Sequence, residues 1–370
     1  MTSSLVNKIK QRIQDSGPVP FDDFMQMALY APSEGYYCRS DSPLGAKGDF
    51  STAPLFSKYF SVCLANQVHQ ICHTQNWDTF NIVEFGPGDG TLARDLLQHL
   101  QTINAPLPKQ YTLVEKSEAL CLRQQQKLST IQTDIKFNWS YPFKDMSPNT
   151  IVIANELLDA FPVKRFEMTD KGLMEIAVTL ENDRLVEVLI SPSPMLVNHL
   201  NWTQQRLKVS SFPVGYRSEA NLGLSLWLKD LSQVLNNGVV IIVDYGYPTA
   251  EYYHPDRTMG TLLCHYQHKS YDDPLIRVGE QDITAHVDFG HVVNAAIEYG
   301  FNYLGFTTQA GFLLGNGLLD IPDVANDVAQ VQMLTHPNLM GEAFKVLALG
   351  VSETPELQAF SIVDHSHRLN

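Results

Sequence analysis

The stretch that decides the fold is NIVEFGPGDGTLARDLL, residues 81–97. An apolar run at 81–85 leads into three glycines within five positions, and leucines at helical spacing follow. Glycine adopts positive φ angles and leaves room for a ligand beside the backbone. The pattern therefore predicts a strand, then a tight turn that can approach a ligand closely, then a helix.

Further runs along the chain have the character of β-strands, and helical patterns lie between most of them. These runs are 111–115, 135–139, 150–155, 239–245, 302–309 and 344–350. Residues 151–154 and 239–243 are apolar throughout, which is typical of strands that are buried on both faces. Strands that alternate with helices favour an α/β fold with a mainly parallel sheet.

Two parts of the chain exceed a minimal alternating fold. About 75 residues precede the first strand, and a long gap separates the fourth strand from the fifth. Within this gap, Asp170-Lys171-Gly172 is predicted to be the turn of a small antiparallel sheet. The predicted segments are an N-terminal helical extension with a cofactor lid (1–75), a core (76–350) that carries an insertion at about 163–235, and a C-terminal tail (351–370).

Composition limits the class of partner. The chain has 370 residues, a formal net charge of −14 and a pI of about 5.2. An acidic surface disfavours nucleic acids and anionic membranes and suits a cationic partner. Five scattered cysteines without a CxxC pattern favour reduced thiols. No apolar stretch is long enough to span a membrane, so we expect a cytoplasmic protein of bacterial type.

The glycine turn is compatible with several ligands. A dinucleotide loop needs G-x-G-x-x-G, and Thr91 stands where the third glycine would be. A P-loop needs Gly-Lys-Ser/Thr, and residues 81–97 contain no lysine. A nucleoside cofactor without a pyrophosphate, S-adenosylmethionine, fits better, because Glu84 suits its ammonium group directly or through water. A tight turn without any ligand is the remaining alternative.

Two more side chains follow neighbouring strands. Glu115 could accept hydrogen bonds from both ribose hydroxyls; dinucleotide enzymes use the same device, so Glu115 indicates a nucleoside without choosing between donors. Trp139 is placed to cover an adenine, or else it is a core residue. The cofactor candidates on the core strands and their loops are Glu84, Gly86, Pro87, Gly88, Asp89, Glu115, Trp139 and Asn155.

The fourth strand runs into Asn155-Glu156, and Asp159 follows one turn later. Ligands of open parallel sheets bind beyond the carboxyl ends of strands. Methyl transfer is an in-line displacement in which the protein mainly positions the nucleophile. Asn155 could orient an amine, and Glu156 could hold a cation, for which a guanidinium is the natural match. Asp159 could assist, or it could cap a helix, and Glu156 could equally be a structural charge at a helix N-terminus.

Seven motifs in order give the sequence a resemblance to the MidA-type class I methyltransferases, the group that contains the mitochondrial complex I assembly methyltransferase. They span roughly residues 20–350, and they are YAPSEGYY (30–37), GAKGDFSTAP (45–54), VEFGPGDGTL (83–92), ANELLDAFPV (154–163), VVIIVDYG (239–246), GTLLCH (260–265) and DITAHVDF (282–289).

The resemblance implies a Rossmann-like class I methyltransferase fold, with a seven-stranded mostly parallel sheet that ends in an antiparallel hairpin. It also implies symmetric dimethylation of an arginine on a subunit of the respiratory NADH dehydrogenase, in the mitochondrial matrix if the source is eukaryotic. Asn155 and Glu156 would then face the acceptor. By the same motifs, the residues that would close over the cofactor are Gly48, Asp49, Phe50 and Thr52.

Several assignments stay open. The mitochondrial form reads Asp-His-Gly where this chain has Asp244-Tyr245-Gly246, which leaves open whether the acceptor contacts there are the same. Asp244 could contact the acceptor or bond the loop backbone. Tyr36 and Tyr37 could line an acceptor channel or only pack, and Asp282 or Thr284 is expected to cap a helix. No metal site is expected.

Rival functions also stay open. One is a small-molecule N- or O-methyltransferase, and the other is a non-catalytic cofactor-binding assembly protein. A homodimer is possible, and no nucleic acid partner is expected.

Overall fold

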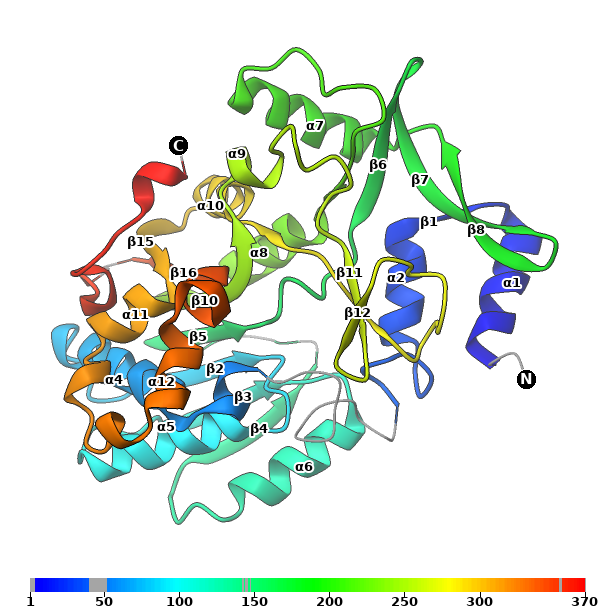
Figure 1. Ribbon diagram of the computed structural model, residues 1–370. Helices are drawn as coiled ribbons and strands as arrows, with labels where there is room; N and C mark the ends of the chain where they lie inside the picture. The colour runs from blue at the N-terminus through cyan, green and yellow to red at the C-terminus, as the bar shows by residue number, and fades with distance from the viewer. Residues whose placement is uncertain are drawn as a thin grey trace.

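The computed structural model describes residues 4–39, 52–141, 143, 146, 148–352 and 355–369. Within these ranges, an eight-stranded sheet forms its centre, with seven strands in the order β15-β16-β10-β5-β2-β3-β4 and one short strand beside them (Figure 1). The seven strands in chain order are β2 (Asn81–Phe85), β3 (Gln110–Val114), β4 (Lys136–Ser140), β5 (Thr150–Asn155), β10 (Gly238–Tyr247), β15 (Asn302–Thr308) and β16 (Phe344–Val351).

The direction of the strands confirms the predicted α/β class I fold. The pairs β10–β5, β5–β2, β2–β3 and β3–β4 are parallel. Strand β16 is antiparallel to both β10 and β15, which confirms the predicted antiparallel end of the sheet. Residues 309–343, which include two α-helices, separate β15 from β16, so the two strands do not form a hairpin with a short turn. A short strand, β14 (Val287–Asp288), pairs with the end of β10. The predicted strands agree with the observed ones to within one or two residues.

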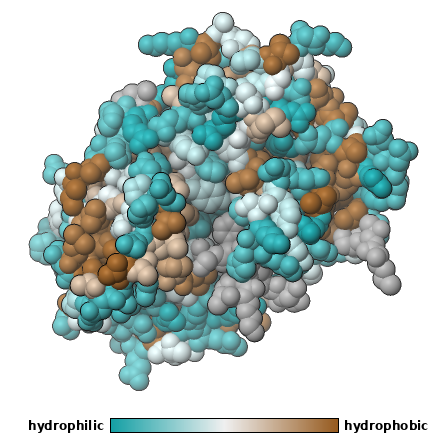
Figure 2. Space-filling view, viewed as in Figure 1, coloured by the Kyte–Doolittle hydropathy of each residue, from teal (hydrophilic) through white to brown (hydrophobic). Residues whose placement is uncertain are grey.

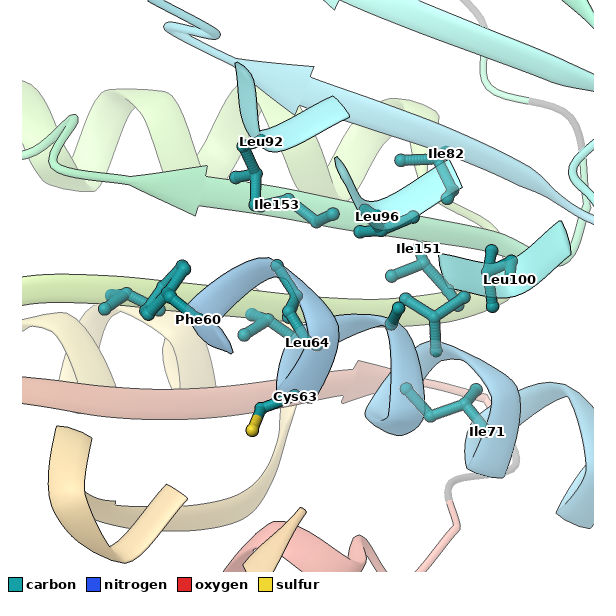
Figure 3. Packing of buried hydrophobic residues seen from close by; sticks show 14 of the residues in the cluster. Phe60, Cys63, Leu64, Ile71, Ile82, Leu92, Leu96, Leu100, Ile151 and Ile153 are labelled. Carbon is teal, nitrogen blue, oxygen red and sulfur yellow. The ribbon is translucent and has the colours of Figure 1, made fainter. Parts of the chain in front are cut away.

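Helices cover both faces of this sheet. One face packs against α4 (Lys58–Thr74), α5 (Thr91–Thr102) and α11 (Gln309–Gly315). The other packs against α8 (Gly223–Val234) and α10 (Phe289–Glu298). Figure 3 shows leucines of α5 and apolar side chains of α4 meeting isoleucines of β2 and β5. Burial of each such side chain contributes roughly 1.5–3 kcal/mol.

A second sheet stands beside the core. Its predicted hairpin is confirmed, since β6 (Lys164–Thr169) and β7 (Gly172–Glu181) are antiparallel around the turn that begins at Asp170. Strand β7 also pairs with β8 (Arg184–Ile190), and β6 pairs with β9 (Arg217–Ala220). Helices α7 (Pro194–Leu207) and α9 (Thr249–Tyr252) pack on this sheet.

The N-terminal helices lie with the second sheet and away from α4 and α5 (Figure 1). Helix α1 (Ser4–Ser16) buries its three regularly spaced apolar residues, Leu5, Ile9 and Ile13. It leads through β1 (Val19–Pro20), which pairs with β7, into α2 (Phe21–Tyr30). The same cluster includes a three-stranded sheet of β11 (Leu263–Tyr266), β12 (Lys269–Tyr271) and β13 (Asp282–Thr284).

The predicted boundaries of the extension, core, insertion and tail stay predictions. Two helices that fall in the predicted extension and insertion nevertheless pack with the core. Helix α4 lies before residue 75 and α8 before residue 235, yet both pack on the core sheet. The remaining elements are α3 (Ala53–Phe56), α6 (Glu118–Leu128), α12 (Val328–Thr335) and the short turns η1 (Leu318–Asp320), η2 (Val324–Asn326), η3 (Pro337–Gly341), η4 (Gln358–Phe360) and η5 (Ser366–Arg368). Within the described ranges, no helix combines the length and apolarity needed to cross a bilayer.

Candidate active site

A cavity of about 470 Å³ lies at the carboxyl ends of β2, β3 and β5. The glycine loop, the start of the segment after β3 and the loop after β5 form its core side. Residues of α2, the turn that follows α2, and β13 form the opposite side. The face seen in Figure 2 is largely hydrophilic, in keeping with the high net charge. Because residues of the core strands and of the N-terminal cluster line the same cavity, the site lies between the core sheet and this cluster.

The glycine loop has the backbone that the sequence predicts. Gly86, Gly88 and Gly90 have φ angles of 60°, 54° and 82°. The Gly86 N–H donates to the Val114 carbonyl oxygen at 3.1 Å, which ties the loop to β3. Positive φ is costly for other residues, and two of these glycines, Gly86 and Gly88, bring bare backbone to the cavity wall.

Asp89 also lines the cavity and is part of the structure of the loop. Its Oδ1 accepts from the Thr91 N–H at 3.0 Å, and its Oδ2 pairs with the Lys127 ammonium at 2.5 Å. Pro87 lies between two of the positive-φ glycines and lines the same wall. The loop is thus held on both sides by α5 and α6.

Glu84 lies beneath the loop with its carboxyl group buried. Its Oε2 accepts from the Tyr111 hydroxyl at 2.7 Å. Burial, with smaller contributions from Asp89 and Glu115, raises the pKa of Glu84 to about 7. A nearby cation would favour the ionised form, so this position suits the ammonium group of S-adenosylmethionine.

Glu115 is oriented by backbone donors. Its Oε1 accepts from the Lys116 and Ser117 N–H groups, both at 2.8 Å. Burial raises the pKa of Glu115. The carboxyl group lines the cavity next to the glycine loop, which is where a ribose would need an acceptor. Together with the positive-φ loop, Glu84 and Glu115 fit a nucleoside that carries a cationic tail.

Trp139 is not among the residues that line the cavity. Its Nε1–H donates to Gln124 Oε1 at 2.9 Å, and Gln124 Nε2 donates to the Gly88 carbonyl oxygen at 2.7 Å. The structure thus does not bring Trp139 to the predicted adenine position, because Gln124 lies between it and the loop. The aromatic residues on this wall are Tyr141 and Phe143, which the sequence reasoning missed.

Glu156 has an unusual backbone. Its φ of 50° is in the left-handed region, which costs a non-glycine residue about 1–2 kcal/mol. The segment 156–161 is not helical, so the helix-terminus alternatives for Glu156 and Asp159 are wrong. Burial, and then the charge of Asp159, raises the pKa of Glu156 to about 8.

Acceptor atoms at this end of the cavity lack partners. Asn155 Oδ1 and Asp159 Oδ1 are buried and have no hydrogen-bond donor within the described part of the chain. The other Asp159 oxygen accepts from the Tyr245 hydroxyl, and burial raises the pKa of Asp159. Buried acceptors without donors are costly. The arrangement is therefore suited to a ligand that brings several N–H donors.

Of the two roles considered for Asp244, contact with the acceptor or hydrogen bonding to the loop backbone, the structure shows the second. Its Oδ2 accepts from the N–H groups of Leu157, Leu158 and Asp159 at 3.2, 2.8 and 3.3 Å. Its Oδ1 accepts from the Tyr245 N–H at 3.0 Å. Asp244 is fully buried and does not line the cavity. It fixes the loop that carries Glu156.

Asp244→Asn is expected to destabilise the fold and to slow catalysis. Both carboxylate oxygens accept from N–H groups, so the new amide must point its own donor at another donor. The loss is roughly 1–3 kcal/mol of stability, and loosening of the Glu156 loop should lower kcat about 10- to 100-fold. Thermal unfolding and single-turnover kinetics measure the two effects. Unchanged kcat would contradict the positioning role.

The buried carboxyl groups also predict a pH dependence of stability. The pKa of Glu156 rises from 4.5 to about 8, and that of Glu84 from 4.5 to about 7. Between these values the folded state binds protons that the unfolded state has released, so stability falls as pH rises from about 5 to about 8. Relative to the wild type, ligand-free Glu156→Gln should gain roughly 2 to 4 °C in Tm between pH 5 and pH 8. A difference that does not grow with pH would refute this.

The remaining predicted residues divide into three groups. Thr52, Tyr36 and Tyr37 line the cavity, and Gly48, Asp49 and Phe50 fall outside the described residues. The prediction that Asp282 or Thr284 caps a helix is wrong. Both lie in β13, and Asp288 caps α10 by accepting from the His291 N–H at 3.2 Å.

Asp282 instead lines the cavity, as do Tyr30, Lys116 and Trp227. Tyr30 and Asp282 begin the motifs YAPSEGYY and DITAHVDF, and Lys116 follows Glu115, but the sequence alone does not show that these residues meet at one cavity. Among the described residues, no cluster of histidine, cysteine, aspartate or glutamate is arranged to hold a metal ion.

The fold and the site define a class of enzyme. A parallel sheet with β5, β2, β3 and β4 in that order carries a positive-φ glycine turn after β2 and an acid after β3. Together with the acidic loop after β5, this is the arrangement of a class I S-adenosylmethionine-dependent methyltransferase. The cofactor is S-adenosylmethionine.

Comparisons identify the family. Residues 63–307 match the model of the family described as "Putative S-adenosyl-L-methionine-dependent methyltransferase", and the chain belongs to this family. A Burkholderia thailandensis protein crystallised with S-adenosyl-homocysteine is 32% identical; the match covers 98% of this chain and 96% of that one, with a TM-score of 0.90.

Curated relatives carry a more specific name. The mitochondrial protein arginine methyltransferase NDUFAF7 of Mus musculus is 27% identical over 93% of this chain and 84% of its own length. The human protein of the same name is 27% identical over 93% of this chain and 83% of its own length. The family and the cofactor are thus shown by comparisons that agree with the site.

Proposed function

We propose that this methyltransferase acts on the ω-nitrogen of an arginine in a protein partner. The observation that carries the proposal is the acceptor end of the cavity. There Glu156 lies near two buried oxygens, Asn155 Oδ1 and Asp159 Oδ1, for which the described part of the chain supplies no donor. A guanidinium offers five N–H donors in a planar fork and stays charged at neutral pH. It matches both the charge and the hydrogen-bonding need of this wall.

Glu156 would hold the acceptor and receive a proton. A guanidinium beside it lowers the pKa of this carboxyl group, because an opposite charge favours the ionised form. Bound S-adenosylmethionine supplies an activated methyl group, and the N–C bond forms as the C–S bond breaks with its electron pair remaining on sulfur. The acceptor nitrogen loses one N–H proton, and the Glu156 carboxylate is placed to take it. Asp244 and Tyr245 hold Glu156 and Asp159 in position.

The relatives support the protein-arginine assignment. The mouse and human relatives are named protein arginine methyltransferases and are mitochondrial. A respiratory-complex subunit is accordingly the first acceptor to examine, and symmetric dimethylation is the product that the family resemblance implies. The acidic balance of the chain agrees with a cationic target.

Labelling a cell lysate tests the proposal. Purified protein and methyl-labelled S-adenosylmethionine are added to the lysate, which is then separated into protein and small-molecule fractions, and the protein is hydrolysed. We expect label in methylated arginine. Label confined to small molecules would establish the small-molecule methyltransferase, and binding of the donor without any transfer would establish the non-catalytic assembly protein.

A further inference from the structure

A third carboxyl group reaches the acceptor end of the cavity from outside the core sheet. Asp282 lies in β13, is 3% exposed and lines the same cavity as Glu156 and Asp159. The Ala285 N–H donates to the Asp159 carbonyl oxygen at 3.0 Å. This bond fixes the end of β13 to the loop after β5. Carboxyl groups from two separate parts of the fold are therefore held around one space.

Two tyrosines of the N-terminal segment hold this arrangement. The Tyr37 hydroxyl donates to Asp282 Oδ1 at 2.8 Å, and the Tyr30 hydroxyl donates to the Ala160 carbonyl oxygen at 2.8 Å. The two rings stack with centroids 5.6 Å apart. Both tyrosines line the cavity. Because both hydroxyls are engaged, the rings form a fixed aromatic wall between Asp282 and the loop after β5.

Carboxyl groups outnumber basic groups among the described residues that line the cavity. Lys116 is the single lysine or arginine among the described residues that line the cavity. Its ammonium lies over the rings of Tyr30 and Tyr141, at 4.6 and 4.9 Å from their centroids. No contact described for Lys116 is to Asp282, Asp159 or Glu156. A cationic ligand would interact favourably with the carboxyl groups that line this cavity.

We propose that Asp282, positioned by Tyr37, is a specificity-determining residue that binds one edge of the acceptor guanidinium while Glu156 binds the other. The inference rests on the proposed function and names the residue that separates arginine from lysine. A guanidinium presents donors along more than one edge, whereas the lysine ammonium is a compact point charge. Carboxyl groups on two elements suit the first shape better than the second.

Binding to the protein saturated with S-adenosyl-homocysteine tests this proposal. Calorimetry is run with a short peptide that contains one arginine and with the same peptide carrying lysine instead. Asp282→Asn should weaken arginine-peptide binding about tenfold or more and reduce the preference for arginine over lysine. Tyr37→Phe keeps the ring but removes the hydroxyl that donates to Asp282, so a smaller loss of about threefold is expected.

The controls separate recognition from folding. Asparagine keeps an acceptor oxygen for the Tyr37 hydroxyl and the Ile283 N–H, so Asp282→Asn should fold and bind S-adenosyl-homocysteine within about threefold of the wild type. Asp272→Asn makes the same charge change at an exposed position beside β12 and should alter neither affinity.

Two results would overturn the proposal. One is arginine-peptide binding by Asp282→Asn as tight as that of the wild type. The other is an equal loss of S-adenosyl-homocysteine affinity, which would make Asp282 a structural residue. Failure of the wild type itself to bind or prefer the arginine peptide would instead reject the proposed function, and this inference with it.

Discussion

Glu156→Gln is expected to lower kcat/KM for methyl transfer by about 10²- to 10⁴-fold. Glutamine keeps the size of the side chain but removes the charge that would hold a guanidinium, and it cannot take the proton that the acceptor nitrogen releases. Affinity for S-adenosylmethionine should change by less than about fivefold, because Glu84 and Glu115 stay in place. Steady-state kinetics and calorimetry measure these two quantities.

A matched control fixes the interpretation of this variant. Glu298→Gln makes the same change at an exposed position at the end of α10, and it should behave as the wild type. Glu156→Gln with wild-type kcat/KM would show that the acid after β5 has no catalytic role. A loss of cofactor binding equal to the loss of activity would make it a cofactor residue instead.

Gly86→Val should abolish cofactor binding. The φ of Gly86 is 60°, a region that is costly for a β-branched residue. A Cβ at this position would lie 3.2 Å from Leu157 Cδ1, a tight contact that adds to the cost of the positive φ. Strain and clash together should weaken S-adenosylmethionine binding by about 100-fold or more, which calorimetry can measure.

Gly172→Val is the control for Gly86→Val, because it introduces the same kind of backbone strain at a glycine outside the cofactor site. Gly172 has a φ of 101° and nothing within 4 Å of an added Cβ, and it lies in the β6–β7 hairpin. This variant should lose stability and keep its cofactor affinity. Wild-type affinity in Gly86→Val would mean that the glycine turn does not contact the cofactor.

Much of the core could be predicted because its signals are local. Strand β2, the glycine turn and three of the four buried leucines of α5 lie within residues 81–97, and each buried strand is an apolar run of its own. Glu84, Glu115 and Glu156 could be placed at the cavity because parallel strands bring their carboxyl ends to one edge of the sheet.

The other half of the site depends on contacts between distant parts of the chain. Tyr37 meets Asp282 across 245 positions of sequence, and no periodicity or motif spacing encodes such a pair. The position of Trp139 near the end of a strand is compatible with an adenine contact or with a core residue, and the sequence does not show that Gln124 of α6 lies between it and the glycine loop. The role of Asp244 could not be predicted from the sequence, because it depends on the path of the loop after β5. The backbone N–H groups of that loop donate to one Asp244 carboxylate oxygen.

The most direct test of the central claim is a crystal structure of the protein with S-adenosyl-homocysteine and an arginine peptide bound together. We expect the ribose hydroxyls to bind the Glu115 carboxyl group, the guanidinium to lie within hydrogen-bonding distance of Glu156, and the glycine turn to contact the cofactor. A guanidinium bound elsewhere, with the carboxyl groups of Glu156 and Asp159 facing only solvent, would contradict this claim.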